Sequence, residues 1–341
     1  MSARRGVLAA GSICVDFNKS IARWPEQDTS NEVLKVERQG GGAGYNMAID
    51  LKRLDRDFPV ETMGVIGEDD LGRFLAGEYD AWGVVRDGLK ALPGGETMSV
   101  DAFNALDTGR RTHFFHSGVA AAMTPEHFDV STSRARILHL GLPGAHAAMD
   151  APWRADANGW VAVLKAAKSA GLMTNLEMMT TAAERLARLC GPCLPHLDYL
   201  IVNDFEIGAL AGVQTRRADG STDVAAVKRA IAAALERGPM RWVVAHFPEG
   251  GVAGGRDGTF ASLGSVAMPA GEIAGVNGAG DAFAAGMLFG LHEGWPIADC
   301  LRLAHAAAAA SMRAVSTTEG VAPVAECLAL ADRWGLRPAP P

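Results

Sequence analysis

The chain is poor in the features that mark several large classes of protein. It has only five cysteines among 341 residues, an odd and scattered set that argues against a disulfide framework and fits a reducing cytosol. No apolar run approaches the length of a membrane span. No block of Lys and Arg is present, and the formal net charge of −7 with a pI near 5.7 argues against a nucleic-acid surface. We therefore expect a cytoplasmic protein that binds neither membranes nor nucleic acid.

Two standard nucleotide-binding fingerprints are also missing. The sequence has no Gly-x-x-x-x-Gly-Lys-Ser/Thr loop, and its glycine runs do not complete Gly-x-Gly-x-x-Gly after a strand. The segment Cys190-Gly191-Pro192-Cys193 has the form of a redox motif. It follows a predicted helix and precedes a predicted strand, whereas thiol activation needs the motif at the start of a helix. Gly191 and Pro192 are therefore interpreted as helix-ending residues.

What the chain does have is an ordinary globular composition, with 48% hydrophobic and 21% charged residues, and enough length to bury a large core. Strand and helix patterns alternate along most of it. Strands are predicted at residues 6–15, 60–66, 137–141, 172–176, 199–202 and 242–245, a meander at 250–264, and helices at 45–54, 71–82, 160–170, 181–189, 224–236, 279–292 and 296–311. Repeated strand–helix units predict a mostly parallel sheet covered by helices on both faces.

One part of the sequence interrupts this alternation. Residues 97–104 and 111–115 are β-prone runs joined by Asp107-Thr108-Gly109, which predicts a hairpin. We expect a small sheet beside the main one, a lid formed by about residues 12–40 and 96–117 and inserted in a single domain of all 341 residues. An exposed edge of this lid could pair between two copies, so a homodimer through the lid is a further expectation.

The chemistry is concentrated in the stretch Gly275-Val276-Asn277-Gly278-Ala279-Gly280-Asp281-Ala282-Phe283-Ala284-Ala285-Gly286. Backbone N–H groups at a helix start attract anions, and the glycines let an anion approach closely. At such a site, Asp281 could take the proton from a hydroxyl that attacks a phosphoryl group. It could equally be an ordinary acidic residue that stabilises the first turn of a helix. The spacing alone does not decide between the two.

Three motifs together resemble the PfkB (ribokinase-like) family of carbohydrate kinases over nearly the whole chain. They are Gly41-Gly42-Ala43-x-x-Asn46-x-Ala48, Asn203-Asp204-Phe205-Glu206, and Asn277-Gly278-Ala279-Gly280-Asp281-Ala282-Phe283 with Gly286 downstream. The resemblance implies an α/β fold, the ribokinase-like three-layer α/β/α sandwich with a mostly parallel central sheet and a small β-sheet lid. It also implies ATP-dependent phosphorylation of a primary hydroxyl of a small sugar or sugar acid, with Mg²⁺.

The resemblance assigns the catalytic and metal-organising roles. Asp281 would be the general base, and the backbone N–H groups of Gly278, Ala279 and Gly280 would form the anion hole for the transferring phosphoryl group. Asn203 and Glu206 would organise Mg²⁺ and its waters beside the ATP phosphates. A purely structural role remains open for this pair, because Asn203 could cap the helix that it starts, with Glu206 completing a capping box.

The resemblance also assigns the ligand contacts. ATP would contact Asn203, Gly251 and Asn277, with His246 and His305 as further nucleotide contacts. The sugar would contact Asp16, Gly42 and Asn46, and His116 could reach it from the lid. From the residues alone, Asp16 could instead be a turn former after a strand, and Asn46 a first-turn helix residue.

The sequence departs from the family pattern at three places. Ala43 stands where ribokinases carry Lys, as in fructokinase- and ketodeoxygluconate-kinase-like members, which argues against ribose itself. Gly275 replaces the Asp at the position where ribokinases bind a monovalent cation, so the resemblance leaves K⁺ activation open. In the usual Thr-x-Gly-x-x-Gly element, His246 and Pro248 stand at the Thr and the first Gly, and only Gly251 is retained.

Two other functions stay open. A nucleoside kinase of the adenosine type is one, because that group also uses Asn-Gly-Ala-Gly-Asp. A non-catalytic sugar- or nucleotide-binding sensor is the other, and the presence of Asp281 together with Asn203 and Glu206 argues against it.

Overall fold

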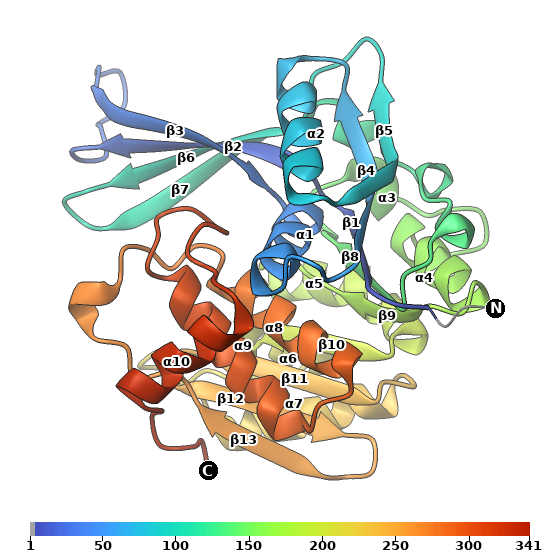
Figure 1. The fold of residues 1–341 in the computed structure, drawn as a ribbon, viewed down its shortest axis with the longest axis vertical. Coiled ribbons are helices and arrows are strands. Elements are labelled where there is room, and N and C mark those ends of the chain that lie inside the picture. The colour runs from blue at the N-terminus through green and yellow to red at the C-terminus, as the bar shows by residue number, and fades with distance from the viewer. Residues whose placement is uncertain (1–3) are drawn as a thin grey trace.

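A central sheet runs through the computed structural model, which describes residues 4–341 (Figure 1). Within those residues it has nine strands, in the spatial order β13 (Phe260–Gly264), β12 (Gly250–Gly255), β11 (Trp242–Phe247), β10 (Tyr199–Asn203), β9 (Met173–Leu176), β8 (Ile137–Gly141), β1 (Val7–Gly11), β4 (Val60–Gly67) and β5 (Val85–Leu92). All neighbouring pairs from β11 to β5 are parallel, and β12 and β13 add an antiparallel edge. The mostly parallel central sheet is thereby confirmed.

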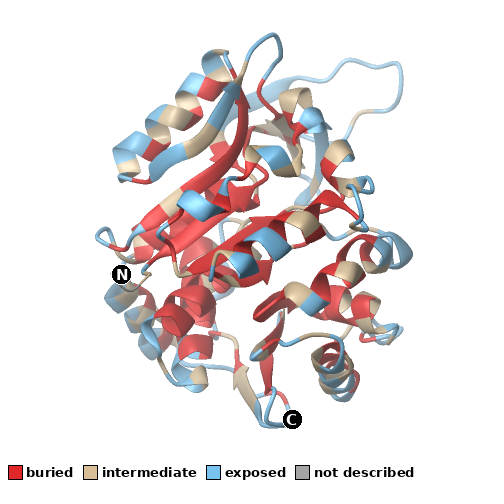
Figure 2. Cartoon of the chain, turned by 90° about the vertical axis from the view of Figure 1, so that its right-hand side faces the viewer, coloured by how far each residue is buried: buried red, intermediate tan, exposed pale blue. Residues whose placement is uncertain are grey.

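Helices cover both faces of this sheet, and each face has its own buried core. The helices packed into one core are α1 (Ala43–Leu54), α2 (Asp70–Trp82), α8 (Ala279–Glu293), α9 (Ile297–Ser311) and α10 (Val324–Trp334). The other core contains α3 (Ala147–Asp150), α4 (Gly159–Ser169), α5 (Ala183–Cys190), α6 (Asp204–Ala211) and α7 (Val224–Glu236). Figure 2 shows the strands and the inner helix faces buried and the outer helix faces exposed. This is the three-layer arrangement that the repeated strand–helix units predict.

Four strands form a second sheet, which we call the small sheet. Their order is β3 (Val33–Gly41), β2 (Cys14–Ile21), β6 (Ser99–Ala105) and β7 (Arg110–His116). It projects away from the central sheet above α9 and the loop that follows it (Figure 1). The turn at Asp107-Thr108-Gly109 joins β6 and β7 as an antiparallel hairpin, as expected from the sequence.

The predicted strand at residues 6–15 is in fact two strands in two sheets. Gly11 has φ +107, a backbone conformation that favours glycine, and β1 ends there. The chain leaves the central sheet at Ser12, whose N–H donates to the Gly141 carbonyl at 2.6 Å, and enters the small sheet as β2. A continuous apolar run does not reveal this change of direction.

Three elements are absent from the sequence-based expectation, the short helix α3, the edge strand β5 and the helix α10. The edge strand β5 carries Arg86, Asp87 and Lys90, and most of its residues are exposed or half-buried, so it lacks the apolar pattern of an inner strand. The helix α10 begins after Pro323, in a segment for which no element was predicted. The remaining short helical turns are 3₁₀ turns at Gly118–Ala122, Pro125–His127, Val130–Thr132, Gly191–His196 and Ala270–Glu272. None of the helices described within residues 4–341 is long and apolar enough to cross a membrane.

Candidate active site

The carboxyl ends of the parallel strands meet the start of α1 at one edge of the sheet. β1 and β8 end side by side at Gly11 and Gly141, and β10 ends at Asn203, which pairs with His246 of β11. The start of α1 packs closely on this edge, because a Cβ added at Gly141 would lie 2.6 Å from the Cβ of Ala43. This edge is where ligands bind in open parallel sheets.

The N-terminus of α8 has the kind of backbone that attracts anions. Gly278 is its N-cap residue with φ +78, and an added Cβ would lie 2.1 Å from the Thr317 carbonyl oxygen, so a side chain is excluded there. No side chain caps this helix start. The backbone N–H groups of Gly278, Ala279 and Gly280 therefore lie at an uncapped positive helix end, with Asp281 in the first turn.

Asp281 accepts a hydrogen bond from helix α1. The Asn46 side chain donates from Nδ2 to Asp281 Oδ2 at 2.6 Å, and the Thr317 hydroxyl donates to Asn46 Oδ1 at 3.1 Å. Asn46 and Thr317 are both buried. The structure thus brings the N-terminal and C-terminal motifs into direct contact across 235 residues.

A second carboxyl group, Glu177, lies beside Asp281 and was missed by the sequence analysis. It directly follows β9, and its negative charge contributes to the raised pKa of Asp281. On its other side, Glu177 Oε2 lies 2.8 Å from Nε2 of the fully buried His139 on β8. Its place at the carboxyl end of a strand, shared with Asn203, was a usable signal, whereas nothing local marks His139.

Burial raises the pKa values of the carboxyl groups that surround Asp281. Burial, together with the nearby Glu177, raises the pKa of Asp281 well above its usual range. Burial raises the pKa of Glu177 to about 7 and that of Asp16 to about 6. Asp50, one turn along α1 from Asn46, is fully buried with no hydrogen-bond partner for either oxygen, and burial raises its pKa as well.

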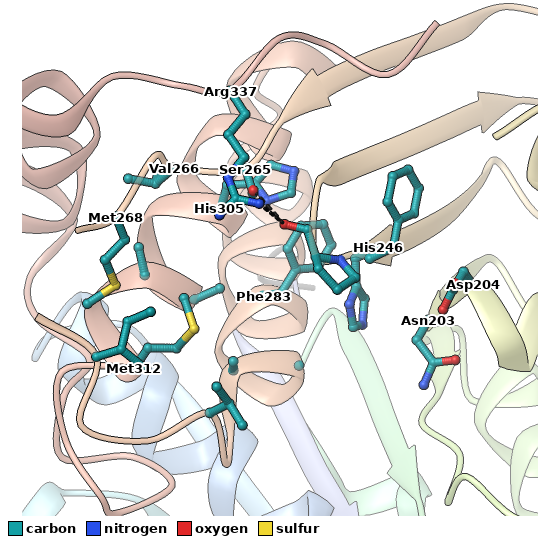
Figure 3. Close-up of a pocket in the computed structure, with 18 of the residues that line it drawn as sticks. Asn203, Asp204, His246, Ser265, Val266, Met268, Phe283, His305, Met312 and Arg337 are labelled. Carbon is teal, nitrogen blue, oxygen red and sulfur yellow. Dashed lines mark hydrogen bonds between the residues drawn. The ribbon is translucent and has the colours of Figure 1, made fainter. Parts of the chain in front are cut away.

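A cavity of about 360 Å³ lies beside the start of α8 (Figure 3). The rings of His246, Phe283 and His305 lie in series along it, with centroids 4.8 Å apart in a tilted pair and 5.0 Å apart in an edge-to-face pair. In Figure 3, Met268 and Met312 lie on one side of these rings and Asn203 on the other. The cavity therefore has an apolar end and a polar end.

The nucleotide contacts expected from the sequence are distributed unevenly around this cavity. Asn203, His246 and His305 line it, together with Ala279 and Gly280 from the helix start. His305 Nε2 has no hydrogen-bond partner, and burial lowers the pKa of His305 to about 3 and that of His246 to about 4, so both rings are neutral.

Two expected nucleotide residues lie outside the lining. Gly251 stands behind His305, because a Cβ added there would lie 3.2 Å from His305 Nε2. Asn277 is not among the lining residues, although its neighbour Val276 is.

Asn203 and Glu206 form the capping box that the sequence left open as a structural role. Asn203 Oδ1 accepts from the Glu206 N–H at 2.8 Å, and Glu206 Oε2 accepts from the Asn203 N–H at 3.0 Å. The Thr180 hydroxyl donates to Glu206 Oε1 at 2.7 Å. Within residues 4–341, no cluster of three or more His, Cys, Asp or Glu side chains is arranged to hold a metal ion by itself. Metal binding here would need further ligands from phosphate and water.

Strand β2 of the small sheet places Asp16 beside the glycine turn that precedes α1. A Cβ added at Gly41 would lie 2.3 Å from Asp16 Oδ2, so the glycine turn before α1 fits against this carboxylate. Gly42, with φ +85, is the N-cap residue of α1. The negative charge of Asp281 contributes to the raised pKa of Asp16. Asp16, Gly42, Asn46 and Asp281 are thus brought together.

His116 is not brought together with them. Asp16 aligns with Val100 and, through it, with Phe115, so Phe115 and not His116 shares its face of the small sheet. The His116 side chain is 63% exposed, with Nε2 3.2 Å from Glu96. Sequence spacing could not predict which of two neighbouring strand residues would face inward, because that depends on the register between β6 and β7.

Arg111 shares the face of Asp16 and reaches the loop beside Gly275. Its Nη2 lies 3.5 Å from the Val315 carbonyl oxygen, and a Cβ added at Gly275 would lie 3.4 Å from the same nitrogen. Arg111 Nη1 is buried with no hydrogen-bond partner. Gly275 therefore leaves space into which a guanidinium group extends from the small sheet.

An uncapped helix start with the half-buried Asp281 in its first turn thus lies beside the cavity at the carboxyl ends of the strands. The chain belongs to the pfkB family of carbohydrate kinases, whose model matches residues 4–324. It superimposes on ribokinase from Arabidopsis thaliana in complex with ribose and ATP with a TM-score of 0.76 and 22% identity, covering 96% of this chain and 98% of that one. Ribokinase from Thermotoga maritima gives the same TM-score, with 18% identity and coverage of 96% and 99%. These structures confirm the fold.

Among curated proteins, the chain is similar to enzymes with different acceptors. An ATP-dependent ribose-1-phosphate kinase of Halopiger xanaduensis is 27% identical over 205 residues, 60% of this chain and 63% of that protein, so the match spans less than two thirds of that relative. A 5-dehydro-2-deoxygluconokinase of Clostridium perfringens is 22% identical over 322 residues, 92% of this chain and 88% of that protein.

Proposed function

We propose that the protein transfers the γ-phosphoryl group of ATP to a primary hydroxyl of a small sugar or sugar acid. The observation that carries this proposal is the position of Asp281, in the first turn of an uncapped helix and in hydrogen-bond contact with Asn46 of α1. A base lies there beside the helix end that would bind the transferring phosphoryl group. Asp16, on the opposite wall, is a suitable acceptor for other substrate hydroxyls.

ATP would lie along the cavity beside α8. The apolar end with Met268 and Met312 suits the base, which would lie beside the neutral His305 ring. The polar end leads to the N–H groups at Gly278, Ala279 and Gly280, where the γ-phosphate would be held. Mg²⁺ would neutralise the phosphates, and Asn203 and Glu206 would hold its waters at the end of β10.

In the transfer step, the substrate hydroxyl gives its proton to the Asp281 carboxylate. The hydroxyl oxygen forms a bond to the γ-phosphorus, while the bond from that phosphorus to the bridging oxygen breaks and ADP leaves with the electron pair. The helix N-terminus stabilises the charge that develops on the transferring oxygens. The small sheet would act as a lid that keeps water from competing with the sugar.

The decisive experiment measures ADP release with Mg-ATP over a panel of sugars, sugar acids, sugar phosphates and nucleosides, with and without K⁺. We expect turnover with a sugar or sugar acid, and Asp281→Asn should lower kcat at least about 1000-fold while ATP binding remains near that of the wild type. Near-normal turnover by the Asp281→Asn enzyme would refute the assignment of the base. Turnover confined to nucleosides would replace the proposed acceptor by the alternative one, and the absence of turnover with every acceptor would favour a sensor.

A further inference from the structure

Two arginine side chains line the cavity beside α8. They are Arg216 and Arg337, and no lysine of residues 4–341 lines it. Arg337 contacts the chain after β11, since its Nη1 lies 3.4 Å from the carbonyl oxygen of Pro248. Arg216 is paired instead with Asp204, which Figure 3 shows next to Asn203 at the polar end of the cavity. The proposed function assigns no role to this ion pair.

The Asp204 carboxylate holds the guanidinium group of Arg216 at two points. Arg216 donates from Nε to Asp204 Oδ2 at 3.0 Å and from Nη2 to Asp204 Oδ1 at 2.7 Å, which fixes the plane of the guanidinium group. The same carboxylate accepts from the Thr222 hydroxyl at 2.8 Å and from the Phe205 N–H at 2.9 Å. The Asp204 side chain is 2% exposed and the Arg216 side chain is 48% exposed. A buried anchor therefore holds an accessible cation.

The backbone that carries Arg216 is also tied to α6. The Thr215 hydroxyl donates to the Asp204 carbonyl oxygen at 2.7 Å, and Arg216 forms an antiparallel bridge with Thr222. Thr215 and Thr222 are both buried. A Cβ added at Gly208 of α6 would lie 2.6 Å from the Thr215 hydroxyl oxygen, so helix and loop are in close contact. Buried contacts therefore set the position of Arg216.

Arg216 retains donors for a ligand. A guanidinium group has five N–H donors, of which Asp204 accepts two. The other three include both on Nη1, and they have no acceptor within residues 4–341. Phosphate oxygens are suitable acceptors for such donors, because a guanidinium group can bind two of them at once.

The start of α8 and Arg216 are joined by a short series of neighbouring residues. A Cβ added at Gly280 would lie 3.5 Å from the His246 ring, and His246 pairs with Asn203 at the end of β10. Asp204 follows Asn203 directly and binds Arg216. Phosphates that extend from the helix start past Asn203 would thus approach this ion pair. Asp204 without its partner would repel them, whereas the pair is neutral and has free donors.

Building on the nucleotide site of the proposed function, we propose that Arg216 binds the α- and β-phosphates of ATP and that Asp204 is a positioning residue that holds Arg216 in place. The γ-phosphate is then held at the start of α8 and the rest of the triphosphate by Arg216. Arg216 supplies the cation that a lysine supplies in Gly-x-x-x-x-Gly-Lys-Ser/Thr loops, which this chain lacks.

The test measures nucleotide binding and needs no acceptor. With Mg²⁺ present, calorimetry should show that Arg216→Ala raises the Kd for ADP about 30-fold, because hydrogen bonds from a cation to phosphate are lost. The Kd for adenosine, obtained from its displacement by ADP, should change less than about threefold, because adenosine has no phosphate.

Arg217→Ala is the matched control. Arg217 belongs to the same loop, has a side chain that is 55% exposed and donates to the Thr222 carbonyl oxygen at 2.9 Å, but it does not line this cavity. Its replacement should change neither Kd. A loss of adenosine binding as large as the loss of ADP binding in Arg216→Ala would overturn the proposal, because Arg216 would then only support the shape of the cavity.

A double variant separates contact with phosphate from neutralisation of Asp204. Arg216→Ala leaves the buried Asp204 unpaired, and repulsion by that charge could itself weaken ADP binding. Asp204→Asn removes the charge. The variant that combines Asp204→Asn with Arg216→Ala should still bind ADP at least about tenfold more weakly than Asp204→Asn alone. Equal ADP affinity in these two proteins would show that Arg216 only neutralises Asp204, and would overturn the proposal.

Failure of the proposed function gives a different result. A wild type that binds Mg-ADP and phosphorylates no acceptor would refute the proposed function, and the ADP affinities of the variants would still decide the role of Arg216. A wild type that binds no Mg-ADP would overturn both.

Discussion

Asp16 lies on strand β2 of the small sheet, and the negative charge of Asp281 acts on its carboxyl group. Burial and that charge raise its pKa to about 6. The ionised form is the better acceptor for a sugar hydroxyl, and it is lost as the pH falls through 6. Acceptor binding should therefore weaken in mildly acidic solution.

The expected size of this effect follows from the pKa alone. Between pH 8 and pH 5 the acceptor Kd should rise about tenfold, measured by calorimetry with an unreactive ATP analogue bound. Asp16→Asn should bind the acceptor more weakly at every pH and lose this dependence. A Kd for the acceptor that stays constant across the range in the wild type would contradict the role of Asp16.

At the scale of elements, the start of α8 depends on a glycine for two separate reasons. Gly278 has φ +78 and no room for a Cβ beside Thr317. Gly278→Ala should lower kcat at least about 100-fold by displacing the anion hole, and should lower the free energy of unfolding by about 2 kcal/mol or more. Steady-state kinetics and urea unfolding measure the two effects.

The other end of the same helix supplies the control. Gly294 has φ +76 and no atom within 4 Å of an added Cβ, so it carries the backbone strain without the clash. Gly294→Ala should cost about 1 kcal/mol of stability and leave kcat unchanged. Equal kinetic losses in both variants would show that strain in α8, not the clash at its start, is responsible.

The small sheet makes its own contact with the loop after α9 through Arg111. Replacing Arg111 by Ala removes the bond to the Val315 carbonyl and should raise the acceptor KM about tenfold, with the KM for ATP changed less than threefold. The neighbouring Arg110→Ala, an exposed residue on the opposite face, should change neither constant. A rise in the ATP constant alone would assign Arg111 to the nucleotide side.

At this scale the limits of sequence reasoning are also visible. The glycine turn, the helix start and the strand ends are local patterns, so the family resemblance could single out Asp281, Asn46 and Asn203 and the three helices that begin at the motifs. The register of β7 is not local, and it decides that Arg111 rather than His116 faces the site. Glu177 and His139 are 38 residues apart, and only the packing of β8 beside β9 joins them.

At the scale of the whole molecule, buried neutral histidines make stability depend on pH. Burial lowers the pKa of His146 to about 4, while the unfolded chain keeps a value near 6.5. Between these pH values His146 binds a proton in the unfolded state and not in the folded state. Its contribution to the free energy of unfolding is therefore complete above pH 6.5 and is lost as the pH falls toward 4.

Replacing His146 should therefore make the free energy of unfolding depend less on pH in acidic solution. His146→Gln should lose about 2 kcal/mol less stability than the wild type when the pH is lowered from 7 to 5, measured by urea unfolding at both values. The comparison within each protein cancels the packing cost of the substitution, which is the same at both pH values. An identical pH response in both proteins would show that the pKa of His146 is not lowered in the folded state.

The small sheet is encoded by chain segments separate from those that carry Asp281 and the cavity. β2 and β3 lie between β1 and α1, and β6 and β7 between β5 and β8, so each pair is an excursion that returns to the central sheet. Asp281 and the nucleotide cavity are encoded elsewhere. Under the proposed function, exchanging residues 14–41 and 99–116 for those of a relative should change the Asp16 side of the acceptor site and leave Asp281 and the start of α8 as they are. Such modular recombination offers a route by which one ancestral kinase could diversify into enzymes for many sugars.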